Sequence, residues 1–182
     1  KRGYDGHNFR RGEVGYFKSR NATNYTQLVA VYALSEAYAM TRIPDLKPVV
    51  ERAVKPIVDG QNANGGWYYN LDAKCPITDT SFASWAVQAL KAAKLAHVGD
   101  ATLKKQIVTS LKKAANGIKT CLHKDGNQAG AFGYLDKMPE KNSYWGLTAP
   151  CVLILQMLDE GDTELCKKSL KYMEAWEPTF KC

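Results

Sequence analysis

The sequence predicts an all-α fold, and three features of the chain favour this class. Apolar residues recur at the spacing of a helix along six segments, whereas the alternation typical of strands is nearly absent. Three segments carry lysines opposite an apolar stripe, and the other three are almost free of charge. Glycine-aromatic stretches, "QNANGGWYYN" (61–70) and "GAFGYLD" (130–136), follow the first two pairs. We therefore expect three helix pairs joined by Gly-aromatic loops.

The composition is that of one globular domain covering residues 1–182, with 45% apolar and 24% charged residues. No apolar run reaches the roughly 18 residues that a membrane span needs. The net charge of +7 could attract nucleic acid, but most lysines fall on the polar sides of predicted helices, so we expect no nucleic-acid partner. The five cysteines are too widely spaced for a disulfide framework.

The first predicted pair covers residues 25–41 and 46–58. The first helix, "YTQLVAVYALSEAYAMT", carries Glu36 as its one charge, so it must be covered on more than one side. The second helix has a single apolar stripe and Asp45 as its expected N-cap. Its stripe consists of Leu46, Val49, Val50, Ala53, Val54, Ile57 and Val58.

The second pair starts at Thr80, with "TSFASWAVQAL", and continues in an amphipathic helix over about 102–122. In the third pair, "YWGLTAPCVLILQML" (144–158) has no charge at all. Pro56 and Pro150 each remove a backbone donor, so we expect a kink or a late start in the helices that contain them. A start at Ala149 with Thr148 as N-cap would place Pro150 in the first turn of this helix. The last helix is expected over 162–176, again with lysines opposite its apolar side.

The alternation of charge-poor and lysine-bearing helices predicts inner and outer layers, as in an α/α toroid, here a partial (α/α)6-type barrel. The repeats cover about 24–70, 80–136 and 144–182. Residues 24–34 align with 80–90 at an offset of 56, and 81–86 align with 144–149 at an offset of 63. The chain begins with what reads as the tail of a repeat, "GEVGYFKSRN", so we expect an incomplete slice of a longer repeat protein.

Residues 52–67, "RAVKPIVDGQNANGGW", resemble the QW motif of the squalene-hopene cyclase and protein prenyltransferase superfamily. The matching positions are Arg52, Ala53, Ile57, Gln61, Gly65 and Trp67, and Pro56 replaces the aromatic residue of the motif. The second pair keeps Lys113 and Ala114, with Leu122 at the Gln position and Phe132 at the Trp position. The third pair supplies the first half, Lys168, Ser169, Tyr172 and Met173, and has Glu177 in place of Gln.

The motif suggests mainly structural roles for Gln61, Gly65, Trp67, Phe132 and Tyr134. A glycine lets the chain turn back after the outer helix, the aromatic ring packs beneath the turn, and Gln61 bonds loose backbone groups. Direct ligand binding by these aromatics is the alternative. The resemblance also implies about twice as many helices in a full toroid, hence flanking repeats or self-association. Bacterial repeat proteins of this type are often exported, which favours a periplasmic or secreted location.

The catalytic motif of the cyclases, D-x-D-D-T-A, is largely replaced here. In "PITDTS" (76–81) only Asp79 and Thr80 match, and Thr78 stands where the resemblance places the proton donor. An Asp directly before a helix is most often an N-cap, so we read Asp79 first as a cap and, in the alternative, as an acid or base.

No metal or cofactor is expected. The prenyltransferase zinc motif D-x-C is absent, and Cys121 with His123 forms a C-x-H pair that lacks further ligands in sequence. Residues 125–136 have the spacing of a calcium loop through Asp125, Asn127, Gly130 and Asp136, but Ala129 cannot ligate through its side chain. A Gly-rich turn is the simpler interpretation.

Two functional hypotheses follow. In the first, the chain is a binding module that presents aromatic residues of its inner helices to a hydrophobic small molecule or a partner domain. These residues are Tyr32, Tyr38, Trp85, Tyr144 and Trp145. In the second, it is an enzyme acting on an isoprenoid or other apolar substrate, with Asp79 as acid or base and the aromatic rings stabilising a cation.

Overall fold

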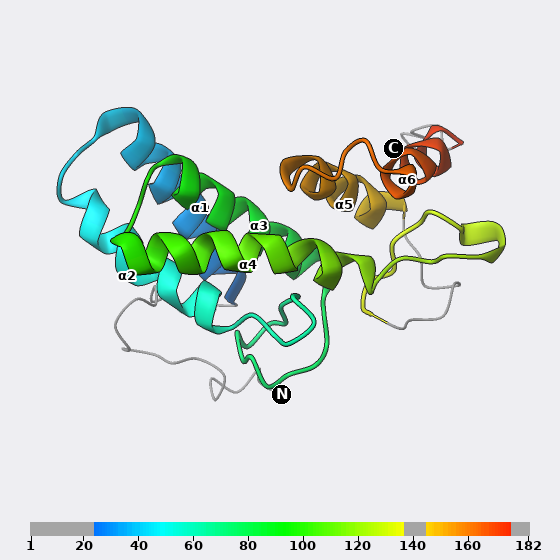
Figure 1. Cartoon of the computed structure of the whole chain (residues 1–182), viewed down its shortest axis with the longest axis horizontal. Coiled ribbons are helices and arrows are strands. Elements are labelled where there is room, and N and C mark those ends of the chain that lie inside the picture. Colours follow the sequence, from blue (N-terminus) through cyan, green and yellow to red (C-terminus); the bar gives the residue numbers. More distant parts are fainter. Residues whose placement is uncertain (1–23, 137–144, 176–182) are drawn as a thin grey trace, which may run out of the picture.

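The computed structural model describes residues 24–136 and 145–175 (Figure 1). The helices of these ranges are α1 (Asn24–Thr41), α2 (Leu46–Asp59), α3 (Thr80–Leu95), α4 (Ala101–Lys119), α5 (Trp145–Met157) and α6 (Glu164–Glu174), with a 3-10 turn at Gly126–Gln128. Within the described ranges, extended pairing is limited to two isolated bridges, Asp79 with Leu135 and Leu122 with Phe132. The all-α prediction is therefore confirmed for this part of the chain.

Helix α3 lies at the centre of the packing. It contacts α1 on one side and α5 on the other, and α2 and α4 also pack against it (Figure 1). Helix α2 packs on α1, and α6 packs on α5. The charge-poor helices are thus neighbours, and each lysine-bearing helix covers its partner. Over the described residues, no helix has both the length and the apolar character that crossing a membrane requires.

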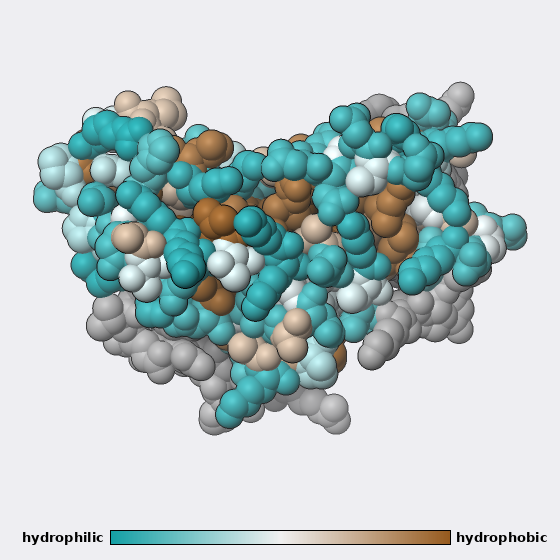
Figure 2. Space-filling view, viewed as in Figure 1, coloured by the Kyte–Doolittle hydropathy of each residue, from teal (hydrophilic) through white to brown (hydrophobic). Residues whose placement is uncertain are grey.

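Helix α4 shows why the outer helices form. Asp100 caps its start, with the carboxylate accepting a hydrogen bond from Leu103 N at 2.8 Å. Its apolar stripe is buried at Ile107, Leu111, Ala114 and Ile118, while Lys104, Lys105, Lys112 and Lys113 are exposed. Figure 2 shows the face that carries α4, where hydrophilic residues dominate. The predicted division between stripe and lysines is confirmed for this helix.

The start predicted for the helix that contains Pro150 was wrong. Helix α5 begins at Trp145, four residues before the expected Ala149, so Pro150 lies inside the helix. Thr148 does not cap it, because its hydroxyl instead accepts a hydrogen bond from Phe132 N at 3.1 Å. Asp45 occupies the N-cap position of α2 but makes no capping hydrogen bond, since its backbone is helical rather than extended.

The first Gly-aromatic corner docks on the following outer helix. Gln61 Nε2 donates to the carbonyls of Gly65 and Ser110, at 2.8 and 2.9 Å, and Ser110 Oγ donates back to Gln61 Oε1 at 2.8 Å. Gly65 has φ +93°, and a Cβ there would overlap the carbonyl oxygen of Lys113. Trp67 is fully buried and donates from Nε1 to Ile57 O at 2.7 Å. These contacts join the first repeat to α4 of the second.

The second corner has the same geometry. Gly130 has φ +99°, and a Cβ there would lie 2.9 Å from the carbonyl oxygen of Lys168 in α6. Phe132, two residues on, is fully buried like Trp67. Gly130 N donates to His123 O at 2.9 Å. Each corner therefore contacts the outer helix of the next repeat.

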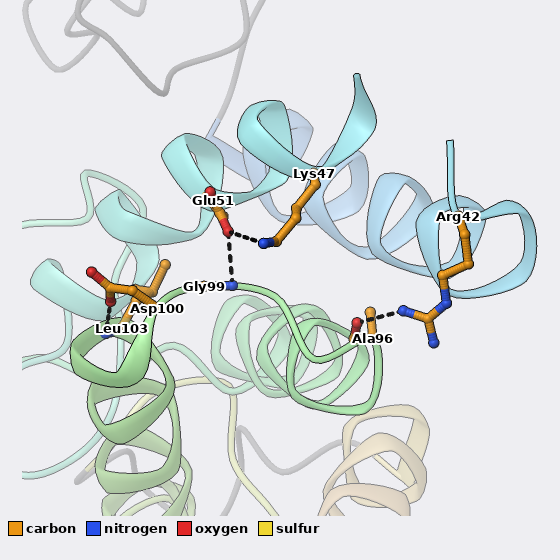
Figure 3. A network of polar contacts seen from close by, with 7 residues as sticks. All are labelled: Arg42, Lys47, Glu51, Ala96, Gly99, Asp100 and Leu103. Atoms are coloured by element: carbon orange, nitrogen blue, oxygen red, sulfur yellow. Dashed lines mark hydrogen bonds and ion pairs between the residues drawn. The ribbon is translucent and has the colours of Figure 1, made fainter. Parts of the chain in front are cut away.

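The opposite end of the layer is joined by polar contacts between the short helix connections (Figure 3). Arg42, just after α1, donates to Ala96 O at the end of α3 at 3.0 Å. Gly99 N donates to Glu51 Oε1 at 3.1 Å, and Lys47 lies 3.6 Å from the same carboxylate oxygen. A cation at the end of α3 also opposes the negative end of the helix dipole. The first two repeats are thus tied together at both ends.

Replacing Gly65 with Ala tests the corner. Alanine would be strained at the positive φ of this position, and its Cβ would overlap the Lys113 carbonyl, so we expect Gly65→Ala to lower the free energy of unfolding by about 2–4 kcal/mol. Urea unfolding measures this change. The matched control is Gly146→Ala in α5, where a Cβ meets no atom within 4 Å, and it should change stability by less than about 1 kcal/mol. Equal changes in the free energy of unfolding for Gly65→Ala and Gly146→Ala would contradict the docking of the first corner on α4.

Candidate functional site

Asp79 stands at the start of α3 and caps it. Its Oδ1 accepts a hydrogen bond from Phe82 N at 2.7 Å, and its backbone is extended, as an N-cap requires. Asp79 N donates to Trp67 O at 2.9 Å, so the first corner leads directly into the cap. The side chain is wholly buried, although it belongs to an ionisable residue. This burial distinguishes it from an ordinary surface cap.

Three tyrosines surround the carboxylate. Tyr69, from the first corner, donates to Asp79 Oδ2 at 2.7 Å, and Tyr25, from α1, lies 3.5 Å from Oδ1. The hydroxyls of Tyr69 and Tyr134 are hydrogen-bonded to each other. The rings of Tyr25 and Tyr69 both pack edge-on against Phe82, with centroids 5.1 and 5.7 Å away. We call Tyr25, Tyr69, Asp79 and Tyr134 the Asp79 cluster.

The segment after the second corner holds the cluster in place. Thr80 N donates to Tyr134 O at 2.9 Å, and Thr80 Oγ1 donates to Gly133 O at 2.6 Å. Thr78 N donates to Asp136 Oδ1 at 3.2 Å. Asn24, which starts α1 as Thr80 starts α3, donates from Nδ2 to Tyr69 O. The first residue of α1 thus donates to the carbonyl of Tyr69, and the first residue of α3 donates to the carbonyl of Tyr134. Each tyrosine lies in the corner that follows its own helix pair.

Burial dominates the electrostatics of the cluster. Desolvation raises the pKa of Asp79 above its usual 3.8, and the hydrogen bonds from Phe82, Tyr69, Tyr134 and Tyr25 only partly oppose it. Burial likewise raises the pKa of Tyr25 to about 12, and that of Tyr69 further still. Both phenols are therefore protonated donors at neutral pH.

Tyr134 is the most exposed residue of the cluster, whereas Tyr25 and Tyr69 are half-buried. Tyr134 is 37% exposed, and its hydroxyl leads through Tyr69 to the buried Asp79. Asp79 itself presents no surface to a substrate. Chemically, the arrangement can store a proton on the carboxyl and exchange it along the tyrosine hydroxyls, but a direct proton transfer from Asp79 to a bound molecule would require rearrangement.

The predicted ligand-binding aromatics are brought together in part. The rings of Tyr32 and Trp85 meet edge to face with centroids 6.3 Å apart, and both side chains are half-buried. Tyr38 lies under the guanidinium of Arg42, which is 5.3 Å from the ring centroid. Tyr144 lies outside the described residues. Trp145 is the first residue of α5, but its side chain also lies outside the described part.

The residues considered for metals and nucleophiles have other contacts. Asp136 binds Thr78 N, and Cys121 Sγ donates to Thr78 O at 3.7 Å. Burial raises the pKa of Cys121 to about 11, so its thiol is protonated at neutral pH. Across residues 24–136 and 145–175, no three His, Cys, Asp or Glu side chains group closely enough to hold a metal ion.

Sequence reasoning missed Tyr25 and Tyr69 as neighbours of Asp79. A signal was present for Tyr69, because it follows Gly65 by four positions, as Tyr134 follows Gly130. Equivalent places in the two corners put the two hydroxyls side by side. Nothing in the sequence singles out Tyr25, which is one of the apolar-face residues of α1.

Comparisons with known proteins leave the family open: no family model, no curated protein and no solved structure matches this chain.

Asp79→Asn tests the buried carboxyl through the pH dependence of stability. A carboxyl whose pKa is raised on folding contributes stability below its unfolded pKa, and this contribution is lost as the pH rises through the folded value. The stability of the wild type relative to Asp79→Asn should therefore fall as the pH rises from about 4 to 7. Urea unfolding of both proteins across this range gives the difference between their free energies of unfolding. The other carboxylates contribute equally to both proteins, so their contributions cancel in this difference. A constant or rising difference would refute a raised pKa.

Proposed function

We propose that the chain is part of an α/α toroid of the squalene cyclase and prenyltransferase type, and that it is a binding module for uncharged hydrophobic ligands. The neighbouring inner helices α1, α3 and α5 and the docked Gly-aromatic corners support the architecture. The corner contacts use the QW-motif positions Gln61, Gly65 and Trp67, which is what the resemblance implies for them.

The inner layer supplies the binding surface. On α3, the half-buried residues Ser81, Trp85 and Gln88 recur at helical spacing and continue to Leu95, which is 61% exposed. Lys91 on this side is occupied, since its Nζ donates to Met157 O at the end of α5. Trp85 and Tyr32 add a rigid aromatic surface with little rotational entropy to lose on binding. Such a surface fits an alkyl or isoprenoid chain better than a charged ligand.

The complete burial of Asp79 is the observation that favours binding over catalysis. Its carboxylate is occupied as the α3 cap and as the acceptor for Tyr69, so it is not presented to a ligand. The enzyme alternative draws on the raised pKa of Asp79 and on the chain of hydroxyls that ends at exposed Tyr134. In that alternative, Tyr134 would face the substrate and Asp79 would supply the proton behind it.

Titration with the neutral fluorescent probe N-phenyl-1-naphthylamine, with farnesol as competitor, tests the binding function. We expect saturable binding that farnesol displaces, and a Kd at least tenfold weaker for Trp85→Ala, because the aromatic contact is lost. Leu95→Glu, at an exposed position, should also weaken binding, and it provides a second test if Trp85→Ala does not fold. The control is Lys105→Ala on the exposed side of α4.

Unsaturable binding, or equal binding by all variants, would contradict the proposal. Asp79→Asn separates the two candidate functions: the binding module keeps its probe affinity in this variant. The enzyme alternative instead requires that the wild type convert squalene to a product detected by mass spectrometry, and that Asp79→Asn abolish this conversion.

A further inference from the structure

Helix α1 has an exposed apolar face at the edge of the inner layer. Met40 is 82% exposed and Val29 is 41% exposed, and Ala33 between them is also exposed. These residues recur at four and seven positions, so they share one side of the helix. The face contains no Lys or Arg. Glu36, three residues after Ala33 and four before Met40, lies within the same stripe and is half-buried. We call Val29, Ala33 and Met40 the α1 edge face.

The corresponding face of α3 is buried. Asn24 and Thr80 begin α1 and α3, and this offset of 56 relates Val29 to Trp85, Ala33 to Ala89 and Met40 to Ala96. Ala89 and Ala96 are fully buried. The ring of Trp85 meets Tyr32 of α1, and Ala96 O accepts from Arg42 at the end of α1. Helix α3 therefore uses this face to pack on the preceding inner helix.

Helix α5 repeats the arrangement against α3. The sequence offset of 63 relates Ala89 of α3 to Val152 of α5. Val152 is only 5% exposed, and α5 packs on α3. Helices α3 and α5 thus bury this face against the inner helix that precedes each of them. Of α1, α3 and α5, only α1 leaves the face exposed.

A second open face lies at the other end of the layer, on α5. Gly146, Ala149, Leu153 and Gln156 are exposed, and Leu153 retains 45% of its surface. They recur along one side of the helix and carry no charge. At the offset of 63, Ala149 and Leu153 correspond to Ala86 and Leu90 of α3, which are fully buried, and α3 is the helix on which α5 packs. We call Gly146, Ala149, Leu153 and Gln156 the α5 edge face.

We infer that a second copy of the chain docks head to tail, with the α5 edge face of one copy on the α1 edge face of the other. This contact continues the interface that already joins α1 to α3 and α3 to α5. The chain carries a net charge of +7, so two copies repel over their lysine-bearing helices, and the two edge faces are free of lysine and arginine. Added salt screens this repulsion and strengthens the association.

Sedimentation equilibrium of the purified chain tests the inference. We expect association that rises with concentration and with salt for the wild type. Ala33→Glu should abolish it, and so should Ala149→Glu combined with Leu153→Glu, because each places charge on an apolar contact. An equimolar mixture of the two variants should recover a dimer and nothing larger, since each supplies the intact face that the other lacks. Thr109→Glu, exposed on α4, is the control and should associate like the wild type.

Two results would overturn the inference. One is a wild-type chain that stays monomeric at the highest attainable concentration and salt. The other is association that is lost in Ala33→Glu but kept in the α5 double variant, which would show that two α1 edge faces pair with each other. Thermal unfolding followed by circular dichroism identifies any variant that fails to fold, and Val29→Glu then replaces Ala33→Glu. The outcome does not depend on the proposed ligand, because the test measures mass rather than ligand binding.

Discussion

Each Gly-aromatic corner lies against the lysine-bearing helix of the next pair, and this close approach holds successive helix pairs together. At Gly65 and Gly130 the backbone adopts a positive φ and lies against the carbonyls of Lys113 and Lys168. A side chain at either glycine would separate the repeats. Below each glycine, a fully buried aromatic residue fills the space between inner and outer helices. The corner thereby fixes both the order and the spacing of the repeats.

The Asp79 cluster is a product of this geometry. The first corner delivers Tyr69 and Asp79 to the start of α3, and the second delivers Tyr134 beside them. Three segments that are distant in sequence therefore meet at a buried carboxyl with a raised pKa. Asp79 both caps α3 and has a pKa raised by burial. The stability of this end of the layer therefore depends on pH.

Local patterns in the sequence predicted the helices well, because burying one stripe requires a periodicity that can be read directly. The stripe of α4, the cap at Asp79 and the turn at Gly65 all depend on neighbouring residues. The start of α5 was missed because Thr148 bonds Phe132 N, a long-range partner that no local capping rule contains. Tyr25 was missed for the same reason. Its role arises only when α1 packs on α3, and an apolar-face tyrosine otherwise looks like ordinary core.

A double-mutant cycle between Gln61 and Ser110 measures whether the first corner is fixed to α4. Gln61 Nε2 donates to the backbone carbonyl of Ser110 at 2.9 Å, and Ser110 Oγ donates to Gln61 Oε1 at 2.8 Å, so the two side chains share one hydrogen bond. Stabilities of the wild type, Gln61→Ala, Ser110→Ala and the double variant give the coupling energy. We expect a favourable coupling of about 0.5–3 kcal/mol. Additive effects, with no coupling, would show that the corner and α4 are independent.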